Sequence, residues 1–250
     1  MSGHSKWASI KHKKAATDSK RGQLFTKVIK ELTVAARNGG GNADSNPRLR
    51  LAISKAKEAN MPKDNIDKAI KKGTGELPGI VYEEVTYEGY GPNGVAVLVD
   101  VLTDNKNRAA AELRNIFTKK NGNMAGAGSV AWQFQQKGII IVDKNQINED
   151  KLMNIILENG AEDMVVQDSS YEISTSIKDF ENVKKAVEDA GVKPSSAEIT
   201  KVPSSTVKIE DKSVAGQVLS LVSSLEEHDD VQNVYANFDI PDNILDELEP

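Results

Sequence analysis

The apolar residues of the first 75 positions recur three or four residues apart, the spacing of one face of an α-helix. The longest stripe consists of Leu24, Phe25, Val28, Ile29, Leu32, Ala35 and Ala36, and the glycines at 39–41 end it. Asn46-Pro47 then supplies a helix cap and a proline at the first helical position. Two shorter stripes follow, made of Leu49, Ala52, Ile53 and Ala56 and of Ile66, Ala69 and Ile70. This quarter of the chain predicts a bundle of three short amphipathic helices.

Beyond residue 80 the pattern changes to short runs of β-branched residues separated by helical stripes. The expected elements are a hairpin of strands 82–90 and 94–102, a helix at 106–120, a strand at 129–134 ("SVAWQF"), a strand at 205–209, a helix around 215–227 and a strand at 231–240. In the last strand, alternation predicts that Val234, Ala236, Phe238 and Ile240 face inward. The stretch at 122–128 is rich in glycine but lacks the order of a phosphate-binding loop. We interpret it as a flexible connection between the helix and the strand.

Between these two halves lies a second complete pattern. Its expected elements are strand 139–143, helix 149–159, strands 162–168 and 171–176, helix 179–190 and strand 197–203. This βαββαβ order is typical of a ferredoxin-like unit. We therefore predict an α+β protein in which a three-helix bundle precedes two ferredoxin-like α/β units, one inserted in the other.

The expected domain boundaries follow from that reading. They are a basic arm and three-helix domain at 1–77, a discontinuous α/β domain at 78–136 plus 204–240, an inserted βαββαβ domain at 137–203, and a C-terminal tail at 241–250. A plain sequential order of domains is the alternative.

Charge changes the picture, because it is distributed unevenly. The 250-residue chain has a formal net charge of −5, but residues 1–75 carry 17 Lys and Arg against 6 Asp and Glu, a net charge of +11. The remaining residues carry a net charge of −16. Such asymmetry favours a segment that meets a polyanion, joined to a body that does not. A merely solvated, lysine-rich helix surface is the plainer interpretation.

The candidate nucleic-acid-binding residues come from the arm and from cations seven positions apart on the predicted helices, which lie on one strip of a helix. They are Lys6, Trp7, Lys11, His12, Lys13, Lys14, Lys20, Arg21, Lys27, Lys30, Arg37, Arg48, Arg50, Lys55 and Lys57. Lysine and arginine both suit phosphate, and Trp7 could stack on a base. Packing of Trp7 onto the apolar face of the bundle is an equally good interpretation.

Several long motifs now carry a family resemblance. "GHSKWASIKHKKAATDSKRGQLFTKVIKEL", "NPRLRLAISKAKEANMPKDNIDKAIKKGTGE" and "YEEVTYEGYGPNGVAVLV" resemble the YebC family, which includes the mitochondrial translational activator of cytochrome c oxidase. The resemblance continues through "TDNKNR" and "FTKKNGNMAGAGSV" to "VQNVYANFDIP". It implies the same three-domain layout. Members of the family are described as transcriptional regulators that bind DNA, whereas mitochondrial relatives act in translation and bacterial ones are connected with ribosomes that slow at proline runs.

The sequence offers little for catalysis. It has no cysteine, no Walker A or GxGxxG spacing, no HExxH and no GxSxG. His228 lies in "EEHDD", which we interpret as the solvated end of a helix rather than a metal cluster. We expect no enzyme activity, no metal and no cofactor. No run of apolar residues is long enough to span a membrane and no secretory signal is present, so we expect a cytoplasmic protein.

Two classes of function remain. The first is a regulator of gene expression that binds nucleic acid; RNA of the translating ribosome is favoured, with ribosomal proteins as possible further partners, and a DNA-binding transcriptional regulator is the alternative. RNA is favoured because no predicted helix presents Asn, Gln or Arg as a recognition helix would, so the cations resemble backbone contacts. The second class is an interaction module whose acidic body docks a basic protein.

Overall fold

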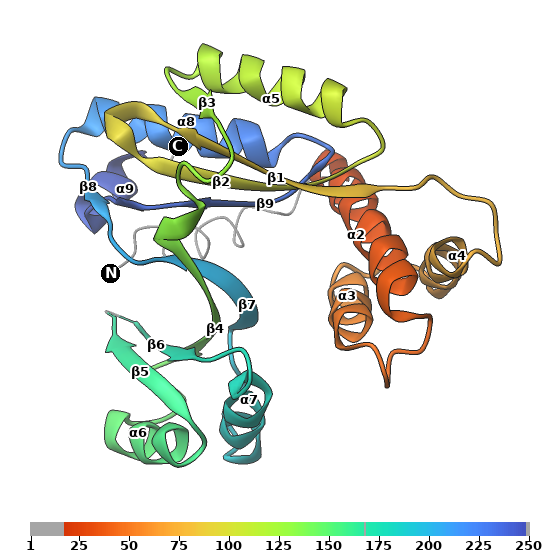
Figure 1. The fold of residues 1–250 in the computed structure, drawn as a ribbon. Helices are drawn as coiled ribbons and strands as arrows, with labels where there is room; N and C mark the ends of the chain where they lie inside the picture. The colour runs from red at the N-terminus through yellow and green to blue at the C-terminus, as the bar shows by residue number, and fades with distance from the viewer. Residues whose placement is uncertain (1–17, 168, 249–250) are drawn as a thin grey trace. The chain divides into compact units, whose positions relative to one another are not determined.

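The protein divides into two compact units, shown here by a computed structural model that describes residues 18–167 and 169–248 (Figure 1). The side chains at 18–21, 242 and 246 lie outside the description. As far as the described residues go, one unit comprises 18–131 with 207–248, and the other comprises 132–206. Helices and antiparallel sheets are both present, which confirms the predicted α+β class.

A helical bundle opens the first unit. It consists of α2 (Asp18–Gly39), α3 (Pro47–Glu58) and α4 (Lys63–Thr74), whose apolar faces share one buried cluster that includes Leu32 and Leu49. Asn46 caps α3 as predicted, accepting a hydrogen bond from the Leu49 amide at 3.1 Å while its own amide group donates to the Ala35 carbonyl at 2.8 Å. Gly73 permits the close crossing of α4 over α2, because a Cβ there would lie 2.3 Å from the Thr33 carbonyl oxygen.

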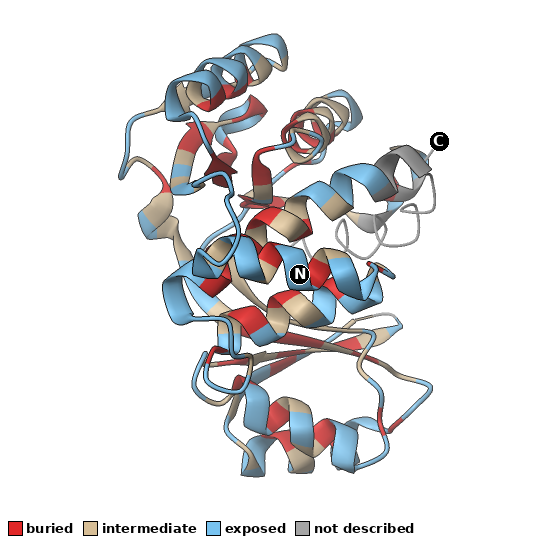
Figure 2. Ribbon diagram, turned by 90° about the vertical axis from the view of Figure 1, so that its right-hand side faces the viewer, coloured by how far each residue is buried: buried red, intermediate tan, exposed pale blue. Residues whose placement is uncertain are grey.

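A four-stranded antiparallel sheet forms the rest of this unit. Its strands, in spatial order, are β3 (Asn123–Ala125), β1 (Glu83–Tyr90), β2 (Ala96–Thr103) and β9 (Val231–Ala236). Two helices, α5 (Lys106–Lys119) and α8 (Lys212–Glu226), cover one face. There Val97 and Val99 pack with Leu113, Phe117 and Val218 in one buried core. Figure 2 shows buried positions in red on both helices and strands. Burial of these side chains is the main force that holds the layers together.

The C-terminal part of the chain completes the first unit. A short two-stranded parallel sheet joins β8 (Val207–Lys208) to β10 (Phe238–Asp239), and α9 (Asp242–Leu248) follows. The four positions predicted to face inward, Val234, Ala236, Phe238 and Ile240, are all buried, which confirms that part of the prediction.

The second unit has the predicted βαββαβ order. Its elements are β4 (Phe134–Asp143), α6 (Glu149–Glu158), β5 (Ala161–Val166), β6 (Ser170–Thr175), α7 (Phe180–Asp189) and β7 (Ser196–Pro203). The spatial order β5-β6-β4-β7, antiparallel throughout, is that of a ferredoxin-like sheet. Ile140, Ile173 and Phe180 lie in its core. At Gly138 a Cβ would lie 2.4 Å from the Phe180 side chain, so glycine lets α7 approach the sheet.

One predicted strand is wrong. Residues 129–133 pair with no strand; instead β3 lies earlier, at Asn123–Ala125, and a 3₁₀ turn, η2 (Ala131–Gln133), leads into β4. The reason is the buried carboxylate of Glu88, which accepts hydrogen bonds from the amides of Gly128 and Val130 at 2.6 Å and of Ala131 at 2.8 Å. Burial raises the pKa of Glu88, but these amide donors outweigh burial and lower it. The chain wraps around a carboxylate here instead of entering the sheet.

The last predicted strand, 231–240, is split in two. Asn237 interrupts it, because its side-chain oxygen accepts from the Ala96 backbone amide at 2.8 Å and its backbone amide donates to the Ala96 carbonyl at 3.1 Å. The chain then leaves the main sheet, and β10 pairs with β8. The strand expected at 205–209 is therefore only two residues long and does not extend the main sheet.

The predicted three-domain boundaries stay a prediction, and one of them, 136/137, falls inside β4. The two ends of the 132–206 segment lie together, since the Ser204 amide donates to the Gln133 carbonyl at 2.7 Å and Phe134 pairs with Pro203.

We expect residues 132–206 to fold alone. We also expect a chain in which a short Gly-Ser linker replaces this segment to keep a cooperative thermal transition. Circular dichroism of both proteins provides the measurement. A disordered isolated segment, together with loss of the transition in the shortened chain, would contradict the inserted-domain layout.

Candidate nucleic-acid interface

The predicted interface falls partly outside the described residues. Lys6, Trp7, Lys11, His12, Lys13 and Lys14 lie outside them altogether. Lys20 and Arg21 lie in the first turns of α2, with side chains that are not described. The other predicted cations have defined surroundings, and these sort them into three groups.

Lys27 and Lys30 face the α/β part of their unit. The Lys30 ammonium pairs with Asp230 Oδ1 at 2.5 Å and donates to the Asp229 carbonyl at 3.0 Å, and the residue is only 7% exposed. Lys27 donates to the Glu226 carbonyl. Because an ammonium buried in an ion pair has no face open to a phosphate, we leave Lys30 out of the interface proposed below.

Asp230 is the centre of this buried network. Its second carboxylate oxygen accepts from the Thr103 hydroxyl at 2.8 Å and from the Arg108 guanidinium at 2.9 Å. Burial raises the pKa of Asp230, but the hydrogen bonds from Lys30, Arg108 and Thr103 outweigh it and lower the pKa to about 2. Sequence reasoning placed "EEHDD" at a solvated helix end and missed this role. Nothing in the local sequence distinguishes Asp230 from its exposed neighbour Asp229.

Arg37 and Arg48 form the second group, which connects the bundle to the segment around β1. Arg48 makes a two-pronged contact with Glu31, at 2.7 and 2.9 Å, and a third bond at 2.8 Å with Glu84. The hydrogen bond with Glu31 is the largest of the effects that raise the pKa of Arg48 above its ordinary value. Arg37 donates to the Tyr82 carbonyl. The charge of Arg48 is thus balanced within the protein, although both arginines retain exposed surface.

The third group is exposed and, among the described residues, makes no ion pair. Arg50, Lys55 and Lys57 project from α3, and Arg50 has only long contacts of 3.4 and 3.5 Å to backbone carbonyls. Further exposed cations lie on α4 and are not among the predicted residues, because the predicted strips run along the first two helices. They are Lys63, Lys68, Lys71 and Lys72. Apart from Arg37 of α2, the exposed cations that make no ion pair in the described bundle therefore lie on α3 and α4.

Neither a metal-binding cluster nor a membrane-spanning helix is present in the described part of the chain. No cluster of three or more His, Asp or Glu side chains is placed there to hold a metal ion. None of the described helices combines the length and apolarity needed to cross a membrane. His228 instead contacts Glu112 Oε2 at 2.8 Å through Nε2, while its Nδ1 accepts from the Asp230 amide at 3.1 Å.

Two family models together match most of the chain. The model described as the TACO1/YebC protein N-terminal domain matches residues 5–76, and the model of the TACO1/YebC second and third domain matches residues 82–238. The chain belongs to the TACO1/YebC family. The resemblance drawn from the sequence motifs is thereby confirmed.

Individual TACO1/YebC relatives match along the full length. A protein of Syntrophobacter fumaroxidans is 57% identical over 248 residues, covering 99% of this chain and 100% of the relative. A protein of Dictyoglomus turgidum is 57% identical over 249 residues, with coverage of 99% and 100%. Both carry the name "Probable transcriptional regulatory protein". The crystal structure of a conserved hypothetical protein from Aquifex aeolicus has a TM-score of 0.81 at 49% identity, covering 91% of this chain and 94% of that one.

Proposed function

We propose that this TACO1/YebC protein is a non-enzymatic, cytoplasmic regulator of gene expression that binds RNA on the translating ribosome. The observation that carries the proposal is the exposed cationic surface of α3 and α4, which has no ion-pair partner among the described residues. On this surface the exposed cations outnumber the exposed acids, which suits a polyphosphate backbone. The names of the relatives support a regulatory role.

RNA suits this surface better than a DNA operator. In a helix-turn-helix, the N-terminal residues of the second helix contact base edges in the major groove. If α3 and α4 formed such a pair, α4 would be the second helix. Asp64 and Asp67 are exposed near its N-terminus. Carboxylates there would face the phosphates that line the groove, and repulsion would oppose docking. Three of its exposed lysines, Lys68, Lys71 and Lys72, lie farther along the helix, where they can contact a backbone without reading a sequence.

The acidic remainder of the chain is consistent with the same proposal. Residues 76–250 carry a net charge of −16, so phosphate would repel them. On a ribosome the acidic surfaces of this part would point away from RNA or contact basic ribosomal proteins. The resemblance to YebC extends the proposal to relief of slow translation at proline runs, which ribosome profiling of a deletion strain would reveal as increased pausing there.

The alternative is a DNA-binding transcriptional regulator, which the names of the relatives favour. We expect the protein to travel with ribosomes at physiological salt and to bind genomic duplex fragments weakly and without preference. A site-specific regulator would instead prefer its operator by about 10³-fold or more over random duplex. Co-sedimentation with ribosomes and filter binding to duplex fragments, in one buffer, separate the two.

A variant with Arg50, Lys55 and Lys57 changed to Gln tests whether the α3 surface carries the ribosome contact. Its ribosome association should fall if the α3 surface carries the contact. One duplex fragment bound with high affinity, with no protein in the ribosome pellet, would overturn the translation proposal and support the transcriptional one.

A further inference from the structure

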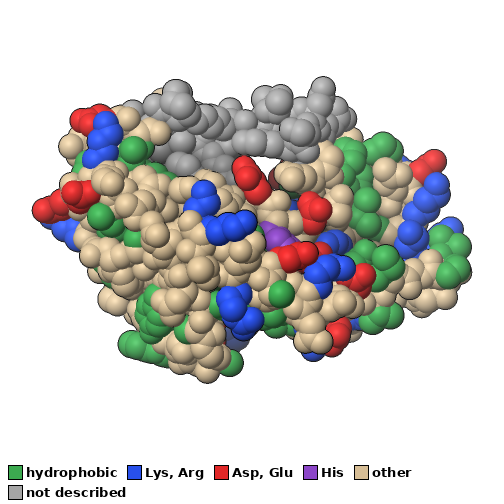
Figure 3. All heavy atoms as spheres, turned by 90° about the horizontal axis from the view of Figure 1, so that it is seen from above, with side chains coloured by type: hydrophobic (Ala, Val, Ile, Leu, Met, Phe, Trp, Pro, Cys, Tyr) green, Lys and Arg blue, Asp and Glu red, His purple; other side chains and the backbone are tan. Residues whose placement is uncertain are grey.

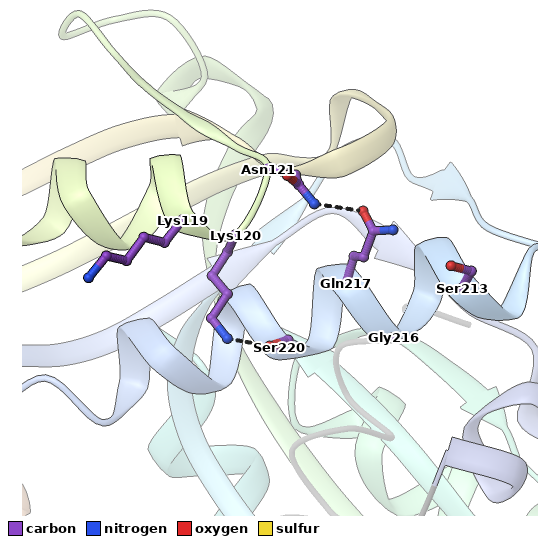
Figure 4. A pocket seen from close by; sticks show the side chains of 7 residues that line it. All are labelled: Lys119, Lys120, Asn121, Ser213, Gly216, Gln217 and Ser220. Atoms are coloured by element: carbon purple, nitrogen blue, oxygen red, sulfur yellow. Dashed lines mark hydrogen bonds between the residues drawn. The ribbon is translucent and has the colours of Figure 1, made fainter.

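A polar groove lies where the end of α5 meets α8, outside the basic N-terminal quarter. It has a volume of about 260 Å³ and is lined by Lys119, Lys120, Asn121, Ser213, Gly216, Gln217 and Ser220 (Figure 4). Every charged group in this lining is a cation, and the others are neutral hydrogen-bonding groups or glycine. The groove is thus complementary to an anion.

The side chains of the groove are partly organised already. The Lys120 ammonium donates to the Ser220 hydroxyl at 2.8 Å, and the Asn121 amide donates to Gln217 Oε1 at 3.2 Å. An ammonium has three N–H donors, so this bond leaves Lys120 further donors for an incoming ligand. Asn121 adopts a left-handed backbone conformation with φ of 59°, which ends α5 and turns its amide toward α8.

The cations of α5 differ between its two ends. Near its start, Lys106 pairs with Glu83 at 2.6 Å, and Arg108 pairs with Asp104 at 2.8 Å and with Asp230. Toward its end, Lys119 and Lys120 make no ion pair with any side chain that the structure describes. On the face shown in Figure 3, some Lys and Arg side chains lie beside Asp or Glu and others are surrounded by neutral surface.

Two lysines without an ion pair are consistent with an anionic ligand, because the segment that forms the other wall of the groove is rich in acids and still places no carboxylate in its lining. Residues 207–250 carry 2 Lys against 11 Asp and Glu, yet none of these carboxylates lines the groove. A simpler role for the two lysines is interaction with the negative end of the α5 dipole. That role needs neither the Ser220 contact nor the Asn121–Gln217 pair, both of which reach across to α8.

We propose that this groove binds a phosphate group of the RNA backbone, as a second contact site in addition to the basic bundle. The inference rests on the proposed function, since it takes RNA as the ligand. Lys119 and Lys120 balance the phosphate charge, and Asn121 and Gln217 supply neutral donors to its oxygens. Because no base edge is needed, the contact is independent of sequence.

The test uses the full chain with Lys119 and Lys120 both changed to Gln. Each phosphate contact on a single strand contributes about −0.7 to the slope of log K against log salt. Two lost contacts should flatten the slope by about 1.4 and weaken binding at about 0.15 M salt roughly 15-fold, if the contribution vanishes near 1 M. Filter binding of a 30-nucleotide single-stranded RNA of mixed sequence, repeated over a salt series, measures both quantities.

The matched control changes Lys184 and Lys185 of α7 to Gln, which alters the net charge by the same amount. Its slope should equal that of the parent. A second variant, Gln217→Glu, keeps both lysines and the shape of the groove but adds a carboxylate beside Lys120. We expect it to weaken RNA binding about fourfold or more, the loss of one contact.

The outcomes separate this inference from the proposed function. If the Lys119/Lys120 variant and Gln217→Glu both bind as the Lys184/Lys185 control does, the groove binds no phosphate and the inference is overturned. The proposed function then still stands, provided that changing the bundle cations Arg50, Lys55 and Lys57 weakens binding. If the bundle variant has no effect while the groove variants do, the groove inference survives and the bundle proposal fails.

Discussion

Replacing Asp230 with Ala is expected to lower the free energy of unfolding by about 3–5 kcal/mol, the cost of leaving a buried charge without its partner. Lys30 is 7% exposed and would lose its partner carboxylate, and Thr103 and Arg108 would each lose a hydrogen bond. Urea unfolding followed by circular dichroism gives the measurement. The loss of stability should come from the contact between α2 and the residue that precedes β9. The two partners in this contact, Lys30 and Asp230, are 200 positions apart in the chain.

Two controls make this result specific. Asp229→Ala removes an exposed carboxylate one position away, and its effect should stay within about 0.5 kcal/mol. Adding Lys30→Met to Asp230→Ala removes the unpaired ammonium, and the double variant should be more stable than Asp230→Ala alone. Equal stability of the Asp229 and Asp230 variants would show that the network contributes nothing measurable.

The same network predicts a dependence on pH. The folded pKa of Asp230, about 2, lies below the ordinary value of 3.8. A carboxylate with a lowered folded pKa stabilises the fold above its unfolded pKa, and this contribution is lost as the pH falls through the folded value. The parent should therefore lose stability between about pH 4 and pH 2, and Asp230→Ala should lose less over that range. Urea midpoints in acidic buffers measure the difference.

Local patterns explain which parts of this fold were predictable. The cap at Asn46 and the proline at Pro47 act within one turn of α3, so sequence alone places the start of that helix. The βαββαβ unit was predictable for a related reason, since its periodic stripes are short and its turns are marked by Gly160 and Gly191. In both cases the deciding interactions lie close together in the chain.

The errors arise where a distant side chain decides. Residues 129–133 have the composition of a strand, but the Glu88 carboxylate about 40 positions earlier takes their amide hydrogen bonds. Asn237 reads as an ordinary strand residue until Ala96, 141 positions away, is placed beside it. A one-dimensional pattern contains no signal for such contacts.

The candidate interface shows that predictions from charge have the same limit. A count of charges locates the basic quarter of the chain, but cannot tell which cations are already paired. Lys30 and Asp230 are 200 positions apart, and Arg48 reaches Glu31 and Glu84 from 17 and 36 positions away. By contrast Arg50, Lys55 and Lys57 keep the exposure that the prediction required. Net charge thus predicts the region of an interface better than its individual residues.

The cationic arm should have the largest effect on RNA binding. Changing Lys11, Lys13, Lys14, Lys20 and Arg21 together to Gln is expected to remove three to five phosphate contacts. At about −0.7 per contact, the slope of log K against log salt should flatten by about 2–3.5. On the same basis the affinity at about 0.15 M salt should fall roughly 50- to 800-fold. Filter binding to single-stranded RNA over a salt series provides the measurement.

A control with the same change of net charge separates contact from general electrostatics. It replaces five lysines of the 132–206 unit with Gln, namely Lys151, Lys178, Lys184, Lys185 and Lys193. If only the net charge of the protein mattered, both variants would bind more weakly to the same extent. Direct contact to phosphate instead flattens the slope only in the arm variant. Equal slopes in the two variants would show that the arm is a solvated surface, and the phosphate contacts would then have to come from α3, α4 and the groove beside α5.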